Sequence, residues 1–121
     1  MESFGEPKVK SNNLWQTLEQ QIRENGIEID RPKGKAHPRF PRLIYPIDYG
    51  YIPHTRSADG EGIDLFLGTS EIKQIVGLIC TFDAVKKDSE IKILYACLEK
   101  EIQTAVTMLS HPPMYALLVR R

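Results

Sequence analysis

The sequence predicts a mainly β domain of the α+β kind, a small five-stranded barrel with one helix at each end. Apolar residues alternate with polar ones through the middle of the chain, and Gly and Pro separate these segments. Helical spacing of apolar residues occurs only near the two ends. A single sheet flanked by helices fits the same pattern and remains the alternative architecture. With 121 residues, the chain is long enough for one domain with a substantial core.

The amino-terminal part divides into a polar stretch and a helix. Residues 1–12 are predicted to be a disordered tail, and residues 13–121 a single domain. Asn13 followed by Gln16 resembles a capping box, after which Leu residues and an Ile recur every four positions until Gly26. The spacing therefore predicts an amphipathic helix that covers the core or contacts a second subunit.

Five extended segments follow, and their residue ranges are 27–31, 43–52, 63–68, 74–82 and 90–98. Within the third, Ile63 and Leu65 alternate with Asp64, so the carboxylate of Asp64 is expected on the opposite face from the aliphatic residues. Residues 99–109 have helical spacing, which ends at a Pro-Pro pair. Residues 114–119 are predicted to be an apolar tail that buries itself against a neighbouring subunit.

Charge and cysteine usage indicate a cytoplasmic protein. Sixteen basic and sixteen acidic residues cancel, so no overall field attracts nucleic acid or membrane, and neither is expected as a partner. Cys80 and Cys97 lie in apolar runs without metal-ligand spacing, which predicts buried free thiols in a reducing compartment. No amino-terminal apolar stretch suggests a signal peptide.

Local charge is uneven. Residues 31–42 contain five Lys or Arg and no acid, which is typical of either a solvated loop or an anion-binding segment. Asp59, Glu61 and Asp64 then place three carboxylates around two glycines. Such a cluster suits a hard cation such as Mg²⁺, although a polar turn would have the same composition. The order of cations before carboxylates favours a site for a metal-bound phosphate compound.

A tyrosine-rich segment, Tyr45-Pro46-Ile47-Asp48-Tyr49-Gly50-Tyr51-Ile52, precedes the acidic cluster, and Asp83 with Glu90-Ile91-Lys92 follows it. Over residues 27–98, this order resembles the soluble (family I), magnesium-dependent inorganic pyrophosphatases. The resemblance implies an OB-like β-barrel, Mg²⁺ as cofactor and hydrolysis of pyrophosphate to two phosphates. It also implies a homo-oligomer, as is usual in that family.

The resemblance implies roles for individual side chains. The metal ligands that it implies are Asp59, Asp64, Asp83 and Glu90. The catalytic residues that it implies are Glu61, Tyr49 and Lys92, with Glu61 accepting the proton of the attacking water. Lys92 and Tyr49 would also bind phosphate, together with an arginine. Arg31 is favoured for this position over Arg39 and Arg42.

Two differences from the family pattern keep another function open. Glu61 and Gly62 stand where the family has Asp and Pro, and no Tyr-Lys pair follows the last predicted strand. A non-catalytic or altered-substrate descendant would bind metal, a small phosphate compound or a protein partner. An OB-fold nucleic-acid binder is disfavoured, because the acidic cluster would repel a phosphate backbone.

Several candidate residues also have purely structural interpretations. Tyr49 would belong to a core face if the tyrosines of its segment packed together. Lys92 alternates with isoleucines and would then be an exposed strand lysine. His37, His54 and His111 share no spacing and are expected on surface loops.

Overall fold

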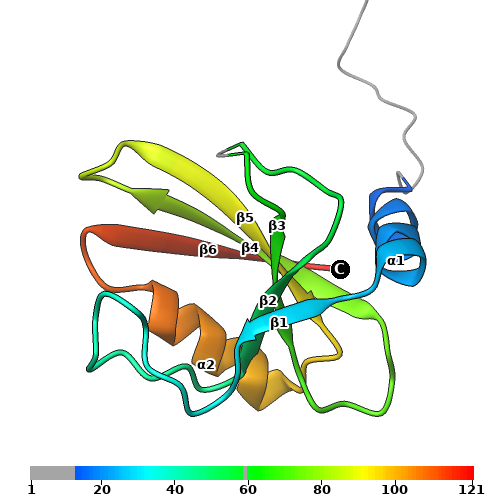
Figure 1. The fold of residues 1–121 in the computed structure, drawn as a ribbon, viewed down its shortest axis with the longest axis horizontal. Helices are drawn as coiled ribbons and strands as arrows, with labels where there is room; N and C mark the ends of the chain where they lie inside the picture. The colour runs from blue at the N-terminus through cyan, green and yellow to red at the C-terminus, as the bar shows by residue number, and fades with distance from the viewer. Residues whose placement is uncertain (1–12, 59) are drawn as a thin grey trace, which may run out of the picture.

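The computed structural model describes residues 13–58 and 60–121. The predicted tail over residues 1–12 and the candidate ligand Asp59 lie outside the described residues. The elements are α1 (Leu14–Asn25), β1 (Glu28–Arg31), β2 (Asp48–Ile52), β3 (Ile63–Leu67), β4 (Ile75–Asp83), β5 (Asp88–Tyr95), α2 (Glu99–Leu109) and β6 (Met114–Arg120) (Figure 1). The mainly β class with two flanking helices is therefore confirmed. Neither described helix combines the length and apolarity that a membrane span requires.

The strands form one mixed sheet in the order β1-β2-β3-β5-β4-β6. Only β3 and β5 are parallel, and every other neighbouring pair is antiparallel. Strand directions turn steadily between β6 and β3 in Figure 1, as expected for a strongly twisted sheet of the OB-like kind. The parallel pair brings together two segments that are distant in sequence.

The sheet has six strands rather than the five predicted, because residues 114–120 pair with β4. The interpretation of this segment as an apolar tail was wrong. Residues 114–119 contain no charged residue, so the period-two alternation that identifies a half-buried strand is invisible there. Pairing with β4 leaves Leu117 exposed on one face, whereas Leu118 packs on the core.

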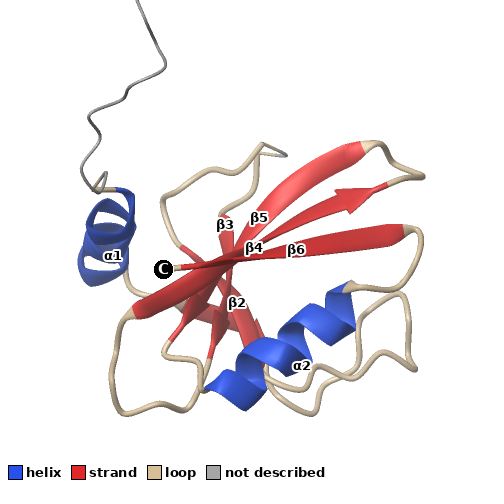
Figure 2. Cartoon of the chain, turned by 180° about the vertical axis from the view of Figure 1, so that it is seen from behind, coloured by secondary structure: helices blue, strands red, loops and turns tan. Residues whose placement is uncertain are grey.

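Each face of the sheet carries its own apolar cluster. Consecutive residues of a strand contribute to different clusters, as Leu65 and Phe66 of β3 do. Leu18 and Ile22 of α1 pack with Leu65, whereas Ile102 of α2 packs with Phe66. The two helices accordingly lie well apart in Figure 2. This two-sided burial explains why β4 contains a long apolar run.

The ends of both helices follow from local hydrogen bonding. Helix α1 ends at Gly26, whose positive φ of 78° suits glycine and whose amide donates to Ile22. The predicted capping by Asn13 was wrong, since its side chain makes no cap hydrogen bond. At α2, the Glu101 carboxylate accepts hydrogen bonds from the amides of Leu98 and Thr69, which ties the helix to the end of β3.

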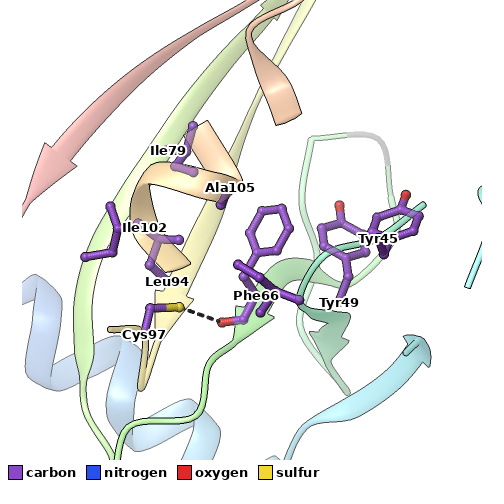
Figure 3. Close-up of a cluster of buried hydrophobic side chains, with 9 residues drawn as sticks. Tyr45, Tyr49, Phe66, Ile79, Leu94, Cys97, Ile102 and Ala105 are labelled. Carbon is purple, nitrogen blue, oxygen red and sulfur yellow. Dashed lines mark hydrogen bonds between the residues drawn. The ribbon is translucent and has the colours of Figure 1, made fainter. Parts of the chain in front are cut away.

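The cluster beneath α2 extends to the tyrosine-rich segment (Figure 3). Tyr45 and Tyr49 stack beside Phe66, and the Cys97 thiol donates to the Phe66 carbonyl over 3.8 Å. Burial raises the pKa of the Cys97 thiol to about 12, so this group is an unreactive core residue. Cys80 is also a free thiol but only half-buried. The cysteine prediction is thus confirmed for Cys97 and only partly for Cys80.

We expect Gly50→Ala to destabilise the protein by about 3 kcal/mol, at the upper end of the cost of overpacking. A Cβ at this position of β2 would collide with the carbonyl oxygen of Glu28 in β1. Relief requires β1 to move away, and β1 carries Arg31. Urea denaturation followed by circular dichroism measures the loss. An unfolding free energy equal to that of the unsubstituted protein would show that the two strands are not so closely spaced.

Candidate active site

A polar cavity of about 520 Å³ lies on the α2 face of the sheet, beyond the apolar cluster. Asp64 is two residues from Phe66 on β3, and it is paired with Lys92 of β5. These side chains therefore share the face of Phe66 but lie further along the strands. The cavity is lined by Asp30, Arg31, His37, Arg39, Phe40, Tyr49, Glu61, Asp64, Lys86, Glu90 and Lys92.

Lys92 is at the centre of the hydrogen bonding in this cavity. Its Nζ lies 2.9 Å from the Asp64 carboxylate and 2.9 Å from the Tyr49 hydroxyl, with the Glu90 carboxylate 3.5 Å away. Burial alone would lower the pKa of Lys92, but the neighbouring Tyr49 and Asp64 oxygens more than offset it and raise the pKa. The residue is only 7% exposed, so the alternative of an exposed strand lysine was wrong.

Tyr49 combines the two interpretations considered for it. Its ring is buried in the core cluster, 4.9 Å from the Phe66 ring, whereas its hydroxyl accepts a hydrogen bond from Lys92. Burial raises the pKa of Tyr49, so the hydroxyl keeps its proton at neutral pH. The hydroxyl keeps its hydrogen, and the neighbouring Asp64 carboxylate, which also hydrogen-bonds this group, contributes to the raised pKa of Tyr49.

Arg31 ends strand β1 opposite Tyr49. Its Nη1 donates to the Tyr45 hydroxyl over 2.7 Å, and the guanidinium carbon lies 5.6 Å from the centre of the Tyr45 ring. This contact orients the guanidinium beside the cavity. Arg39 also lines the cavity, whereas Arg42 lines a separate groove beside α2. Of the three candidate arginines, the structure places Arg31 and Arg39 near Tyr49 and Lys92.

Three of the predicted acidic residues, Glu61, Asp64 and Glu90, line the cavity. Asp83 is the last residue of β4, and its Oδ1 accepts hydrogen bonds from the amides of Lys86 and Val85 in the following turn, each over 2.9 Å. These backbone hydrogen bonds lower the pKa of Asp83. Asp83 is not among the residues that line the cavity.

The acidic residues of the cavity suit a hard divalent cation, because carboxylate oxygens are the ligands that such ions prefer. Lys92 lies between Asp64 and Glu90 and pairs with both carboxylates. Across residues 13–58 and 60–121, no three His, Cys, Asp or Glu side chains converge closely enough to enclose a metal. Asp59 lies outside that search. The described residues that could contribute oxygen ligands to a cation are Asp64 of β3, Glu90 of β5 and Glu61 of the loop before β3.

The loop that carries Glu61 is held by short polar contacts. The Thr55 hydroxyl donates to the Ile52 carbonyl over 2.6 Å and accepts from the Ile63 amide over 3.0 Å. A Cβ at Gly62 would lie 2.6 Å from the Tyr51 ring, so the present packing leaves room there for glycine alone. The absence of proline at this position has a local steric reason.

Sequence reasoning missed four residues of the cavity, namely Asp30, His37, Phe40 and Lys86. His37 was expected on the surface, yet its half-buried ring stacks on Tyr45 with 6.2 Å between centroids. Phe40, His37, Tyr45, Tyr49 and Phe66 form a series of ring contacts that we call the aromatic ladder. The position of His37 within the basic segment of residues 31–42 was the sequence signal that could have assigned it to the cavity.

Comparisons with known proteins agree on one family. A family model described as inorganic pyrophosphatase matches residues 19–116. A curated inorganic pyrophosphatase from Corynebacterium glutamicum is 44% identical over 43 residues, which are 33% of this chain and 27% of that protein. The sequence match thus spans about a quarter of that relative's length.

Solved structures of similar fold include inorganic pyrophosphatases from two bacteria. The structure from Neisseria gonorrhoeae has a TM-score of 0.62 at 16% identity and covers 80% of this chain and 84% of its own. The structure from Helicobacter pylori has a TM-score of 0.52 at 12% identity, with coverages of 78% and 81%. At such low identity these similarities show the fold alone, and they confirm the OB-like class.

Proposed function

The chain belongs to the inorganic pyrophosphatase family, and we propose that it hydrolyses inorganic pyrophosphate to two phosphates with Mg²⁺ as cofactor. The observation that carries this proposal is the contact of Lys92 with both Tyr49 and Asp64 inside a cavity that Arg31 also lines. Anion-binding groups and carboxylates thereby face the same small volume. A metal-bound polyphosphate needs both kinds of group.

The cationic side chains would bind and orient the substrate. Pyrophosphate carries several negative charges, which must be balanced when the anion leaves water. The Lys92 ammonium is buried and already fixed by Tyr49, so it needs little reorganisation to meet a phosphate oxygen. Arg31 offers a planar pair of N–H donors that matches two phosphate oxygens. The protonated Tyr49 hydroxyl adds a neutral donor.

The acidic side chains would hold the cation, and membership of the family generally implies a divalent cofactor. In this proposal Asp64 and Glu90 would be ligands from the cavity lining, and Asp59 and Asp83, which the described lining does not include, would be further members of the metal-binding set. Bound there, Mg²⁺ would neutralise phosphate oxygens and lower the pKa of a coordinated water. A cation held by Asp64 would balance part of that carboxylate's charge, and Lys92 would then pair with a phosphate oxygen while it keeps its contact with Tyr49.

Glu61 is proposed to accept the proton of the attacking water. It lines the cavity from the loop before β3, close in sequence to Asp64. A glutamate reaches one methylene further than the aspartate of the family pattern, and its neighbour Gly62 packs closely against the Tyr51 ring. In this proposal Glu61 accepts the proton of the attacking water, as the family aspartate does, despite its longer side chain and the tight packing of Gly62 on Tyr51.

The proposal also includes a homo-oligomer in the cytoplasm. Tyr115 and Leu117 are exposed apolar side chains on the face of β6 that points away from the cluster beneath α2, and they support a subunit contact. Free thiols at Cys80 and Cys97 support a reducing compartment.

We expect the purified protein to release phosphate from pyrophosphate only in the presence of a divalent cation, with Mg²⁺ more effective than none by at least about a hundredfold. A colorimetric phosphate assay with millimolar Mg²⁺, or with a chelator in its place, measures this difference. Other small phosphate esters serve as the comparison, and pyrophosphate should be preferred. Absence of turnover with Mg²⁺, Mn²⁺ and Zn²⁺ alike would contradict the proposed function and support a non-catalytic member of the family.

A further inference from the structure

His37 has the geometry of a substrate-binding donor that the family resemblance did not indicate. Its ring stacks on Tyr45, with 6.2 Å between centroids and 14° between planes, and its other neighbour in the aromatic ladder is Phe40 at 5.0 Å. Tyr45 in turn accepts the hydrogen bond of Arg31. The imidazole is therefore held beside the arginine that is proposed to bind phosphate.

One hydrogen bond determines which imidazole nitrogen carries the proton. The Arg39 amide donates to Nδ1 of His37 over 3.0 Å, so Nδ1 acts as an acceptor and the proton of the neutral ring is on Nε2. Among the described residues, Nε2 has no hydrogen-bond partner, and the side chain lines the cavity. The N–H that remains is available to a ligand.

Burial and nearby positive charges disfavour the imidazolium form of this ring. Burial lowers the pKa of His37, and so do three nearby cations, Arg31 on β1, Arg39 on the same loop and Lys86 on the turn between β4 and β5. Protonation would place a hydrogen on Nδ1 and would break the bond from the Arg39 amide. A neutral donor brings no further positive charge to a cavity that already has several cations.

We propose that His37 binds a phosphate oxygen of the substrate through its Nε2–H, as a neutral hydrogen-bond donor whose orientation is set by the Arg39 amide and the Tyr45 ring. This inference rests on the proposed function, since it names a further contact to the same substrate. It differs from a structural role of His37 in the loop because it assigns separate tasks to the two ring nitrogens.

Two substitutions separate these tasks. In His37→Asn, the side-chain oxygen takes the place of Nδ1 and still accepts from Arg39, but the distal donor is lost. In His37→Gln, the side-chain amide reaches the position of Nε2 and keeps a donor that does not titrate. His111→Asn is the matched control, because His111 lines the separate groove beside α2.

The measurement is calorimetric binding of methylenediphosphonate, a pyrophosphate analogue that is not hydrolysed, in a buffer with Mg²⁺. We expect His37→Asn to weaken binding roughly tenfold or more, the effect of losing a hydrogen bond to a charged group. His37→Gln should stay within about threefold of the unsubstituted protein, and the control should be unchanged. Nitrogen NMR of the complex should show the neutral ring with its proton on Nε2.

Three results would overturn the inference. Undiminished binding by His37→Asn, equal losses in both variants, or an imidazolium in the complex would each exclude a neutral Nε2 donor. In these cases binding by the unsubstituted protein would still support the proposed function. If the unsubstituted protein does not bind the analogue, the inference and the proposed function both fail.

Discussion

Asp64→Asn is expected to lower pyrophosphate hydrolysis by at least about a hundredfold, the cost of removing one preorganised charged group from an active site. The substitution keeps the shape of the side chain but removes a charge that faces both Lys92 and the proposed metal. An amide oxygen binds Mg²⁺ less strongly than a carboxylate does. Phosphate release under saturating Mg²⁺ and pyrophosphate measures the effect.

Asp88→Asn is the control for this substitution, because Asp88 is an exposed aspartate of β5 that does not line the cavity. Its activity should remain within about twofold of the unsubstituted protein, as for most surface changes. Circular dichroism should show the same fold for both variants. Unchanged turnover in Asp64→Asn would mean that the metal lies elsewhere, and the assignment of the site would be wrong.

Phe66→Ala should lower the free energy of unfolding by about 3–5 kcal/mol, the usual cost of emptying the space of a buried phenylalanine. Phe66 is 0% exposed and lies at the centre of the cluster beneath α2. Its ring meets Tyr49 edge-on at 4.9 Å, so the substitution also removes the support of the Tyr49 ring. Urea denaturation measures the stability loss, and phosphate release at low temperature measures any accompanying loss of activity.

Phe82→Ala provides the matched comparison. Phe82 belongs to β4, is 46% exposed and lies on the face of the sheet opposite to that of Phe66. Its cost should stay below about 1 kcal/mol, because nearly half of the residue is already accessible to water. A similar cost for the two phenylalanines would contradict the two-sided arrangement of the core.

Much of the fold could be predicted because its signals are local. The alternation around Asp64, the helical spacing before Gly26 and the Pro-Pro pair after α2 each predict an element from neighbouring residues alone. Strand β6 could not be found in this way, since residues on both of its faces are apolar. The predicted capping by Asn13 was wrong, because a suitable residue type does not ensure the hydrogen bond.

Only those residues of the candidate site that the family resemblance identifies by their order along the chain could be predicted. The resemblance named Tyr49, Asp64 and Lys92, which the structure brings into direct contact. His37 was assigned to the surface because its position depends on stacking with Tyr45 and not on any spacing along the chain. Arg31 could not be separated from Arg39 for a similar reason, since the folded loop brings both to one cavity.

The parallel pairing of β3 with β5 has a consequence for how the candidate active site assembles during folding. Asp64 and Lys92 are 28 residues apart, and strand β4 must be placed beyond β5 before the sheet is complete. Closing this loop costs conformational entropy before the contacts between the strands can form. Pairing of strands that are distant in sequence is therefore slow compared with helix formation. We therefore expect the two side chains to meet late, and the recovery of the proposed hydrolysis after dilution from denaturant to follow the completion of the sheet.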